Sequence, residues 1–215
     1  ELADRSETVD RAARAMALQF RGYVLYEWNR LDEARELLHA AVAGAEEVGA
    51  RGVLSGSYRM LSVLEIAAGR EDRARGWMAR LEELMTGDCR PPLSERNREW
   101  LAATRAGLAA ATGDLRAADR WIRRRGYRAR ELARAGPATL LASLHEVTTL
   151  LDVLLALERP EEVRALASAT REAAASRGRR RFEARAGAME AAALEGVGRP
   201  TEAEAALDRA LQAGR

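Results

Sequence analysis

The sequence contains no lysine and a single cysteine, Cys89, among its 215 residues. A lone cysteine excludes an internal disulfide and favours a reducing compartment, so we expect a cytoplasmic protein. Without lysine there is no phosphate-binding loop of the Walker type. We recognise no signal peptide and no apolar run of membrane-spanning length, so we expect no membrane partner. Because the chain begins with Glu1 rather than Met, we expect it to be a fragment of a larger multidomain protein.

Aromatic residues are also scarce, at 5% of the chain, and no segment alternates apolar and polar residues as a half-buried strand would. Ala, Leu, Glu and Arg dominate instead, and these are strong helix formers. The composition therefore predicts an all-α fold. The formal net charge is only +2, from 35 basic and 33 acidic residues, so the two signs must be interspersed. This balance argues against direct nucleic-acid binding by this segment.

Candidate catalytic and metal-ligating groups are few. His39 and His145 are the only histidines, and Cys89 is far from both in sequence. No two His or Cys residues have metal-ligand spacing, and no glycine-rich loop follows a strand. Carboxylates are abundant, but on amphipathic helices they usually form the solvated face. We therefore expect no enzyme activity, no metal and no cofactor in this segment.

A short motif recurs five times. It consists of a turn, then charged residues or proline, then a small apolar residue that opens a new helix. The copies are Asn29-Arg30-Leu31-Asp32-Glu33-Ala34, Gly69-Arg70-Glu71-Asp72-Arg73-Ala74, Gly113-Asp114-Leu115-Arg116-Ala117-Ala118, Glu158-Arg159-Pro160-Glu161-Glu162-Val163 and Gly198-Arg199-Pro200-Thr201-Glu202-Ala203. We term the last residue of each copy the small-residue position. Successive small-residue positions are 40, 44, 45 and 40 residues apart.

The motif is typical of the turn inside a helix hairpin. Glycine ends a helix in the left-handed conformation without steric cost. Asp, Thr or Pro then begins the next helix, and acidic residues in its first turn suit the helix dipole. The small residue lets the two helices approach closely.

Apolar periodicity around each motif predicts a pair of helices. The first helices are expected at about 8–28, 53–68, 94–112, 138–157 and 180–197, and the second helices at about 31–48, 71–86, 115–124, 160–176 and 201–213. Pro91-Pro92 and Gly136-Pro137 mark loops. The span 125–137 is left open as a loop or a short extra helix. The prediction is a single domain over 1–215, a right-handed α-solenoid of about five helix hairpins.

A helix pair with a small residue opening its second helix resembles the tetratricopeptide repeat, and Gly22, Ala34 and Ala41 lie where the first repeat needs small residues. Over most of its length the chain resembles more closely the tetratricopeptide-like sensor region of MalT-like regulators, the large ATP-dependent members of the LuxR class. This resemblance is carried by three stretches, namely Gly113-Asp114-Leu115-Arg116-Ala117-Ala118-Asp119-Arg120-Trp121-Ile122-Arg123-Arg124-Arg125-Gly126, Ala175-Ser176-Arg177-Gly178-Arg179 and Ala205-Ala206-Leu207-Asp208-Arg209-Ala210-Leu211.

The resemblance implies a parent protein with an ATP-using nucleotide-binding domain and a C-terminal helix-turn-helix that binds DNA. Neither is found in this sequence, so ATP is expected only in the absent domain. The chain would then be the effector- or partner-sensing region of a bacterial transcriptional regulator. The alternative is a free-standing scaffold that mediates protein–protein interaction. The parent reading frame separates the two, because only the regulator encodes nucleotide-binding and DNA-binding domains.

In tetratricopeptide solenoids the first helix of each pair lines the concave face, where a ligand binds. Counting from the small-residue position, we predict ligand-binding residues on this face at Gln19, Tyr23, Tyr26, Arg59, Trp100, His145, Thr148, Asp152 and Arg185. Aromatic and hydrogen-bonding side chains together suit a sugar, a nucleoside or a peptide. His145, Thr148 and Asp152 are spaced to share one helix face. The alternative is that Trp100 and the tyrosines pack between repeats.

Arginines crowd two other regions, 120–134 and 177–181. The first region includes Trp121 and Tyr127, and basic residues among aromatics can bind phosphates or bases. Cations at a helix C-terminus also offset its dipole, which is the interpretation we favour. Docking to an acidic face of a missing domain is a third possibility.

Exposed terminal repeats permit homo-oligomers, and the apolar residues Leu207 and Leu211 suggest that a partner covers the C-terminal end.

Overall fold

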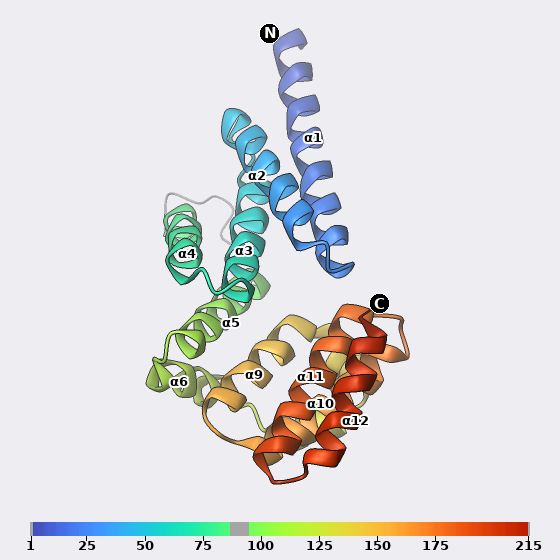
Figure 1. The fold of residues 1–215 in the computed structure, drawn as a ribbon. Coiled ribbons are helices and arrows are strands. Elements are labelled where there is room, and N and C mark those ends of the chain that lie inside the picture. Colours follow the sequence, from blue (N-terminus) through green and yellow to red (C-terminus); the bar gives the residue numbers. More distant parts are fainter. Residues whose placement is uncertain (1, 87–94, 215) are drawn as a thin grey trace. The chain divides into compact units, whose positions relative to one another are not determined.

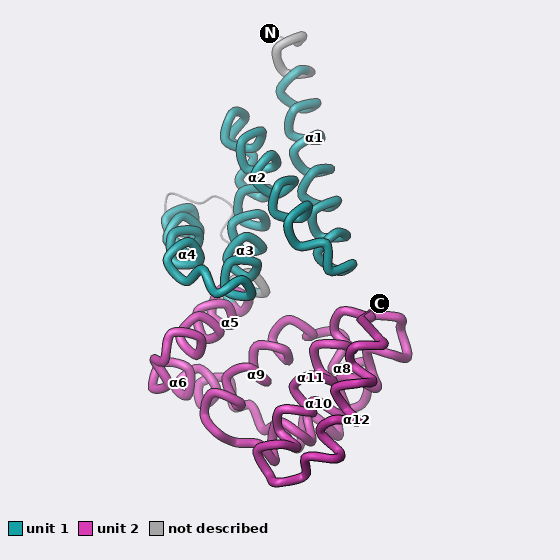
Figure 2. Tube along the Cα trace, viewed as in Figure 1, with its two compact units in different colours: residues 1–98 teal, residues 99–215 magenta. Residues whose placement is uncertain are grey.

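The computed structural model describes residues 2–86 and 95–214, and this part of the chain folds into twelve α-helices without a β-strand. The predicted all-α class is confirmed. Two compact units are present, residues 1–98 and 99–215 (Figure 2). The single domain expected over 1–215 stays a prediction. Cys89 and the Pro91-Pro92 loop lie outside the described residues.

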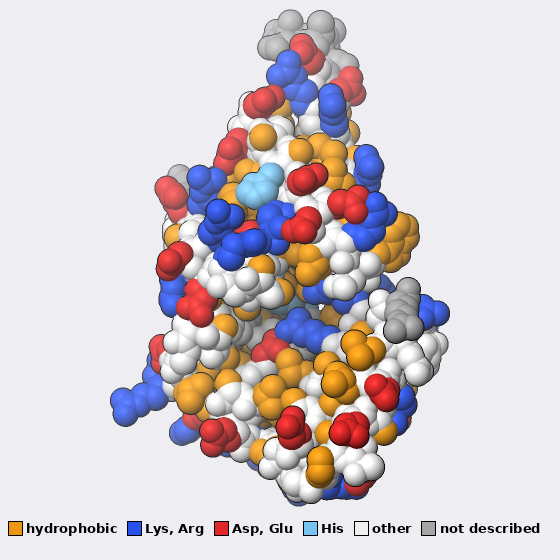
Figure 3. Space-filling view, viewed as in Figure 1, with side chains coloured by type: hydrophobic (Ala, Val, Ile, Leu, Met, Phe, Trp, Pro, Cys, Tyr) orange, Lys and Arg blue, Asp and Glu red, His pale blue; other side chains and the backbone are white. Residues whose placement is uncertain are grey.

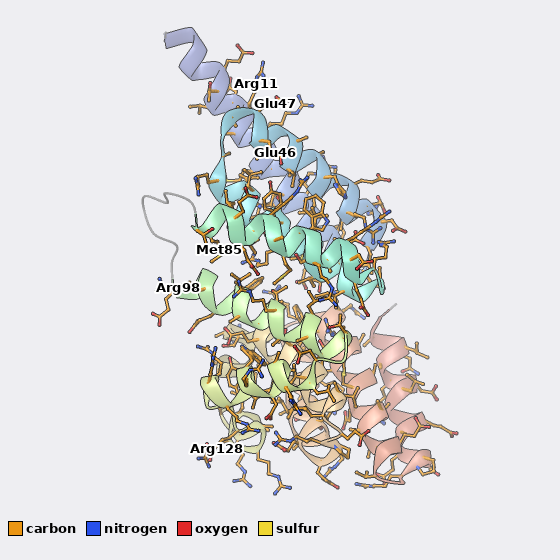
Figure 4. The ribbon with its side chains drawn as sticks, turned by 90° about the vertical axis from the view of Figure 1, so that its left-hand side faces the viewer. Arg11, Glu46, Glu47, Met85, Arg98 and Arg128 are labelled. Carbon is orange, nitrogen blue, oxygen red and sulfur yellow. The ribbon has the colours of Figure 1, made fainter. Side chains whose placement is uncertain are left out.

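Unit 1 contains two helix hairpins (Figure 1). Its helices are α1 (Leu2–Glu27), α2 (Leu31–Val48), α3 (Arg51–Ala67) and α4 (Glu71–Thr86). Each helix packs on the next along the chain, as expected for a repeat. Arg11 on α1 also forms an ion pair with Glu47 on α2, at 3.4 Å, on the side shown in Figure 4. Helix α1 begins several residues before the predicted start at residue 8.

Unit 2 contains the remaining hairpins and shares one extended apolar core. Helices α5 (Glu95–Ala111, in this unit from Glu99), α6 (Leu115–Arg125) and α9 (Leu144–Ala156) all contribute to that core, together with α10 (Pro160–Ala175). The last hairpin, α11 (Arg180–Gly196) and α12 (Pro200–Ala213), packs on α10 through α11. The first and second helices therefore alternate in the predicted order.

The turn of every hairpin has the left-handed backbone that the motif predicts. The φ angles are positive at Asn29 (60°), Gly69 (67°), Gly113 (79°), Glu158 (54°) and Gly198 (73°). In four of the five turns the next residue's N–H donates to the carbonyl five residues earlier, at 2.9–3.0 Å, which is the helix-ending bond of a Schellman turn. The motif therefore requires a left-handed backbone at this position rather than glycine itself, and Asn29 and Glu158 adopt that backbone with a side chain.

The small-residue positions lie where the two helices of a hairpin touch. Ala34, Ala74, Ala118 and Val163 are fully buried, and Ala203 is nearly so. Gly22 on α1 is equally constrained, since a Cβ there would lie 2.9 Å from Leu38 Cγ on α2. Larger side chains at these positions would push the helices apart.

The predicted helix over 138–157 is wrong in one respect, because the chain breaks it at Ser143. Two helices result, α8 (Pro137–Ala142) and α9, and both pack on α10. Ser143 leaves the helical conformation (φ −123°, ψ 26°), and its carbonyl accepts the first bond of α9 from Val147. Leu140 on α8 and Leu144 on α9 are both buried. The span left open at 125–137 contains a further short helix, α7 (Ala129–Arg134).

Candidate functional site

The nine predicted ligand-binding residues fall into two groups, one in each unit. Unit 1 holds Gln19, Tyr23, Tyr26 and Arg59, and unit 2 holds Trp100, His145, Thr148, Asp152 and Arg185. Within each unit the structure brings most members of the group into contact with one another or with a neighbouring first helix.

In unit 1, Gln19 and Tyr26 are buried. Gln19 Nε2 donates hydrogen bonds to the Val53 carbonyl, at 2.6 Å, and to Ser57 Oγ, at 3.1 Å. Both acceptors are on α3, so the amide holds the two first helices together. Gln19 therefore links the first two hairpins, while Tyr26 is buried.

Tyr23 and Arg59 form a second link between α1 and α3. Arg59 Nη2 donates to Tyr23 Oη at 3.4 Å. Burial raises the pKa of Tyr23, and the charge of Arg59 opposes that shift. Gly56 makes room for the contact, because a Cβ there would lie 2.5 Å from Gln19 Nε2 and 2.6 Å from Tyr23 Oη.

In unit 2, the ring of Trp100 on α5 stacks on the imidazole of His145 on α9. The centroids are 4.1 Å apart and the planes meet at 25°. Thr104 Oγ1 lies 3.4 Å from His145 Nε2. Trp100 and His145 are both half-buried.

Asp152 and Arg185 form an ion pair between α9 and α11, in which Arg185 Nη2 donates to Asp152 Oδ2. Both side chains are partly exposed. Burial raises the pKa of Asp152, while the charge and hydrogen bond of Arg185 act in the opposite direction.

Thr148 lies on the same helix but does not present its hydroxyl. It is buried, and Oγ1 donates within α9 to the carbonyls of Leu144 and His145, each at 2.9 Å. Of the three residues predicted to share one helix face, only His145 and Asp152 therefore offer polar groups beyond α9.

The remaining four residues occupy related places in the repeat. Trp100, His145 and Arg185 each lie 18 residues before the small-residue position of their hairpin. Asp152 is on α9, the helix of His145, and it accepts a hydrogen bond from Arg185 on α11. We call Trp100, His145, Asp152 and Arg185 the first-helix face of unit 2.

Sequence reasoning missed a charged network beside this face. Arg125, at the end of α6, donates to Glu99 at 2.6 Å and to the buried Glu146 at 2.9 Å. Tyr127 also donates to Glu146, and the guanidinium of Arg125 lies over the Tyr127 ring. Burial, followed by the bond to Glu146, raises the pKa of Tyr127 to about 12. Glu99 and Glu146 are adjacent in sequence to Trp100 and His145. This adjacency to two predicted site residues was the only sequence feature that could have pointed to the network.

The arginine-rich region around α6 and α7 lines a cavity of about 540 Å³ in unit 2. Three of its arginines have acidic partners, in the pairs Arg123–Asp119, Arg128–Glu131 and Arg159–Glu162. Arg123, Arg124 and Arg125 form the last turn of α6, as the helix-dipole interpretation requires. Arg128 projects from the outer edge of the unit (Figure 4). Three of the four arginines that line the cavity therefore have an acidic partner in the same lining.

Charges of both signs also alternate over the rest of the visible surface (Figure 3). Short-range pairs such as Arg30–Glu33 and Arg199–Glu202 recur in the turn motif. Within residues 2–86 and 95–214, no three His, Asp or Glu side chains are placed to share a metal ion. Among the same residues, no helix is both long and apolar enough to cross a bilayer.

Helix hairpins with left-handed turns and small residues at the helix crossing define a tetratricopeptide-like helical repeat. The chain belongs to the MalT-like TPR region family, whose model matches residues 1–215. This confirms the resemblance drawn from the turn motifs. No curated protein and no solved structure is similar enough to count as a match. Repeat regions of this kind typically serve in sensing or scaffolding rather than in catalysis.

Proposed function

We propose that this chain is the sensing region of a larger bacterial transcriptional regulator of the LuxR class, and that it binds a small molecule or a protein through the first-helix face of unit 2. The observation that carries the proposal is the contact of Trp100 with His145 at equivalent places in successive hairpins. Arg185 holds the same place in the last hairpin and reaches Asp152.

The chemistry of this face suits a ligand with both apolar and hydroxyl or amide groups. A half-buried aromatic stack offers a flat surface for a sugar ring, a base or a peptide side chain. The exposed parts of Asp152 and Arg185 offer a hydrogen-bond acceptor and several donors. These groups are already oriented by each other, which lowers the entropy lost on binding.

The regulator would work through a population shift. An effector on this face changes the balance between resting and active states only if it binds one state more tightly. ATP binding and DNA binding are assigned to other domains of the parent protein, and no nucleic acid, cofactor or membrane is assigned to this segment. The proposed regulator acts in the cytoplasm.

The test is a titration of the chain with three probe classes: neutral oligosaccharides, nucleosides and amphipathic peptides. Tryptophan fluorescence and the melting temperature are followed. Binding by at least one class, with a fluorescence change that disappears in Trp100→Phe, supports the proposal. Trp77→Phe is the matched control, because Trp77 lies in unit 1 and packs on Tyr58. The Trp77→Phe variant should retain the response.

Two results would contradict the proposal. If no probe class changes the fluorescence or the melting temperature, the face is not a binding site for these ligands. If a response survives both Trp100→Phe and Asp152→Asn, the binding site is elsewhere. A response to peptides alone favours the scaffold function over small-molecule sensing.

A further inference from the structure

The cavity beside α6, α7 and α10 in unit 2 is bounded mainly by charged side chains. It is lined by four arginines and three carboxylates, namely Arg123, Arg128, Arg130, Arg159, Asp119, Glu131 and Glu162. The lining therefore has a formal charge of +1. Its volume of about 540 Å³ lies within the range of about 300–1,000 Å³ that is usual for small-molecule sites. Phosphate binding was one of the alternatives for the arginines of region 120–134, and three of them line this cavity.

The turn motif shows that Arg159 is held less tightly than its equivalents. Arg159 is the second residue of the fourth motif and forms an ion pair with Glu162, three residues later. The corresponding pairs of the first and last motifs are Arg30–Glu33 and Arg199–Glu202. Each of those pairs is joined by two hydrogen bonds of 2.5–2.6 Å. Arg159 Nε lies 3.6 Å from Glu162 Oε1, which is too far for a hydrogen bond.

Two further arginines of the cavity also have guanidinium groups without a hydrogen-bonded acceptor. Arg128 Nη1 lies 3.7 Å from Glu131 Oε1, and both side chains are largely exposed. Arg130 has neither an ion pair nor a hydrogen bond through its side chain within the described part of the chain. Arg123 differs, because it donates a hydrogen bond to Asp119. Three guanidinium groups around one cavity therefore retain donors for a ligand.

We propose that this cavity binds the phosphate group of a small phosphate monoester through Arg128, Arg130 and Arg159. A phosphate monoester has three terminal oxygens and a charge of about −1.5 to −2 at pH 7. Three guanidinium groups match these oxygens better than they match the two of a carboxylate. The buried residues Ile122 and Ala129 also line the cavity and offer an apolar contact to the organic part. The site adds to the first-helix face and does not rest on the function proposed for that face.

Isothermal titration calorimetry of the whole chain tests the site with two esters, phenyl phosphate and glucose 6-phosphate. Phenol, glucose and inorganic phosphate are the comparison ligands. At least one ester should bind, its uncharged counterpart should give no saturable heat, and inorganic phosphate should bind more weakly because it lacks the organic part. Added NaCl should weaken ester binding, since the attraction is between charges.

Substitutions at equivalent repeat positions give matched controls. Arg159→Gln and Arg130→Gln should each weaken ester binding about tenfold, as expected when one charge-assisted hydrogen bond is lost. Arg199→Gln, at the same motif position in the last hairpin, should leave the affinity unchanged. Glu162→Gln raises the formal charge of the lining to +2 and should tighten binding about threefold. Glu202→Gln should have no effect.

Three results overturn the proposal. If neither ester gives saturable heat, or if binding survives both Arg159→Gln and Arg130→Gln in variants that circular dichroism shows to be folded, the cavity is not the site. If inorganic phosphate binds as tightly as the esters, the organic part makes no contact. If a short DNA duplex binds equally well and loses binding in the same variants, the arginines form a nucleic-acid surface instead. Trp100→Phe, which tests the first-helix face, should leave ester binding unchanged, so the two proposals fail separately.

Discussion

Asp152 on α9 and Arg185 on α11 are joined in an ion pair that links successive first helices of unit 2. The charge of Arg185 favours ionised Asp152, but burial outweighs it, and the pKa of Asp152 ends above its ordinary value of 3.8. The pair therefore stabilises unit 2 less than its geometry suggests, because the carboxylate is partly removed from water.

The raised pKa predicts an unusual pH dependence for this carboxyl group. The folded state binds the Asp152 proton more tightly than the unfolded state, so the Asp152 contribution to the unfolding free energy falls as pH rises from below 3.8 through the raised pKa. Urea unfolding across this pH range should show the fall in wild type but not in Asp152→Asn. Arg185→Gln should enlarge it. A contribution that rises with pH would contradict this account.

The network around Glu146 predicts a difference between two arginines of α6. Arg125→Met removes the ion pair of a nearly buried carboxylate, and we expect a loss of about 2 kcal/mol in the unfolding free energy, less than for a fully buried pair. Arg123→Met is the control, because Arg123 is exposed in its pair with Asp119. It should leave the unfolding free energy nearly unchanged. Equal effects in urea titrations would show that the Glu146 network adds nothing.

The fourth turn predicts a stabilising substitution. Glu158 has a φ of 54°, a conformation that glycine adopts without a Cβ clash. Glu158→Gly should therefore raise the unfolding free energy by about 1 kcal/mol. The reverse change, Gly198→Ala at the equivalent place in the last turn, should lower it by a similar amount. Thermal melts followed by circular dichroism measure both changes, and a destabilised Glu158→Gly would be evidence that its side chain supports the turn.

The burial of the small-residue positions predicts that larger side chains there destabilise the fold. Ala34→Leu should overpack the contact of α2 with α1 and lower the unfolding free energy by about 1–3 kcal/mol, and Ala118→Leu should do the same in α6. Ala43→Leu on the exposed side of α2 is the control and should change it by about 0.5 kcal/mol at most. Wild-type stability of Ala34→Leu would mean that α1 and α2 do not meet at this position.

The five turns could be predicted from sequence because their determinants are local. A left-handed residue, a helix start and a small residue all lie within six positions, so each copy of the motif is readable by itself. Even Glu158, which lacks the glycine, is recognisable from the Pro160 that follows it. The break at Ser143 could not be predicted in this way, since no Pro or Gly marks it and the spacing of Leu140 and Leu144 is that of a continuous helix.

The candidate site was predictable by position but not by pairing. Counting from the small-residue position gave Trp100, His145 and Arg185 equivalent places on three first helices, and the structure places Trp100 against His145 and Arg185 against Asp152. Counting did not indicate that Trp100 stacks on His145, or that Thr148 bonds within its own helix. Those outcomes depend on rotamers and on the separation of neighbouring helices. The contacts of Arg125 with Glu99 and Glu146 join three helices, and the three residues do not recur at a fixed repeat position that the sequence would show.

The bonds that close the turns also bear on how the chain folds. Each runs from a backbone N–H to a carbonyl only five residues earlier, as in Arg30 to Leu25 and Arg199 to Leu194. Loops this short lose little chain entropy on closing, and structures rich in such contacts fold rapidly. In arrays where a hairpin contacts chiefly its neighbours, stability is nearly a sum of local terms. A terminal hairpin can then open while the adjacent ones stay folded, which amide hydrogen exchange would register as a gradient of protection along the helices.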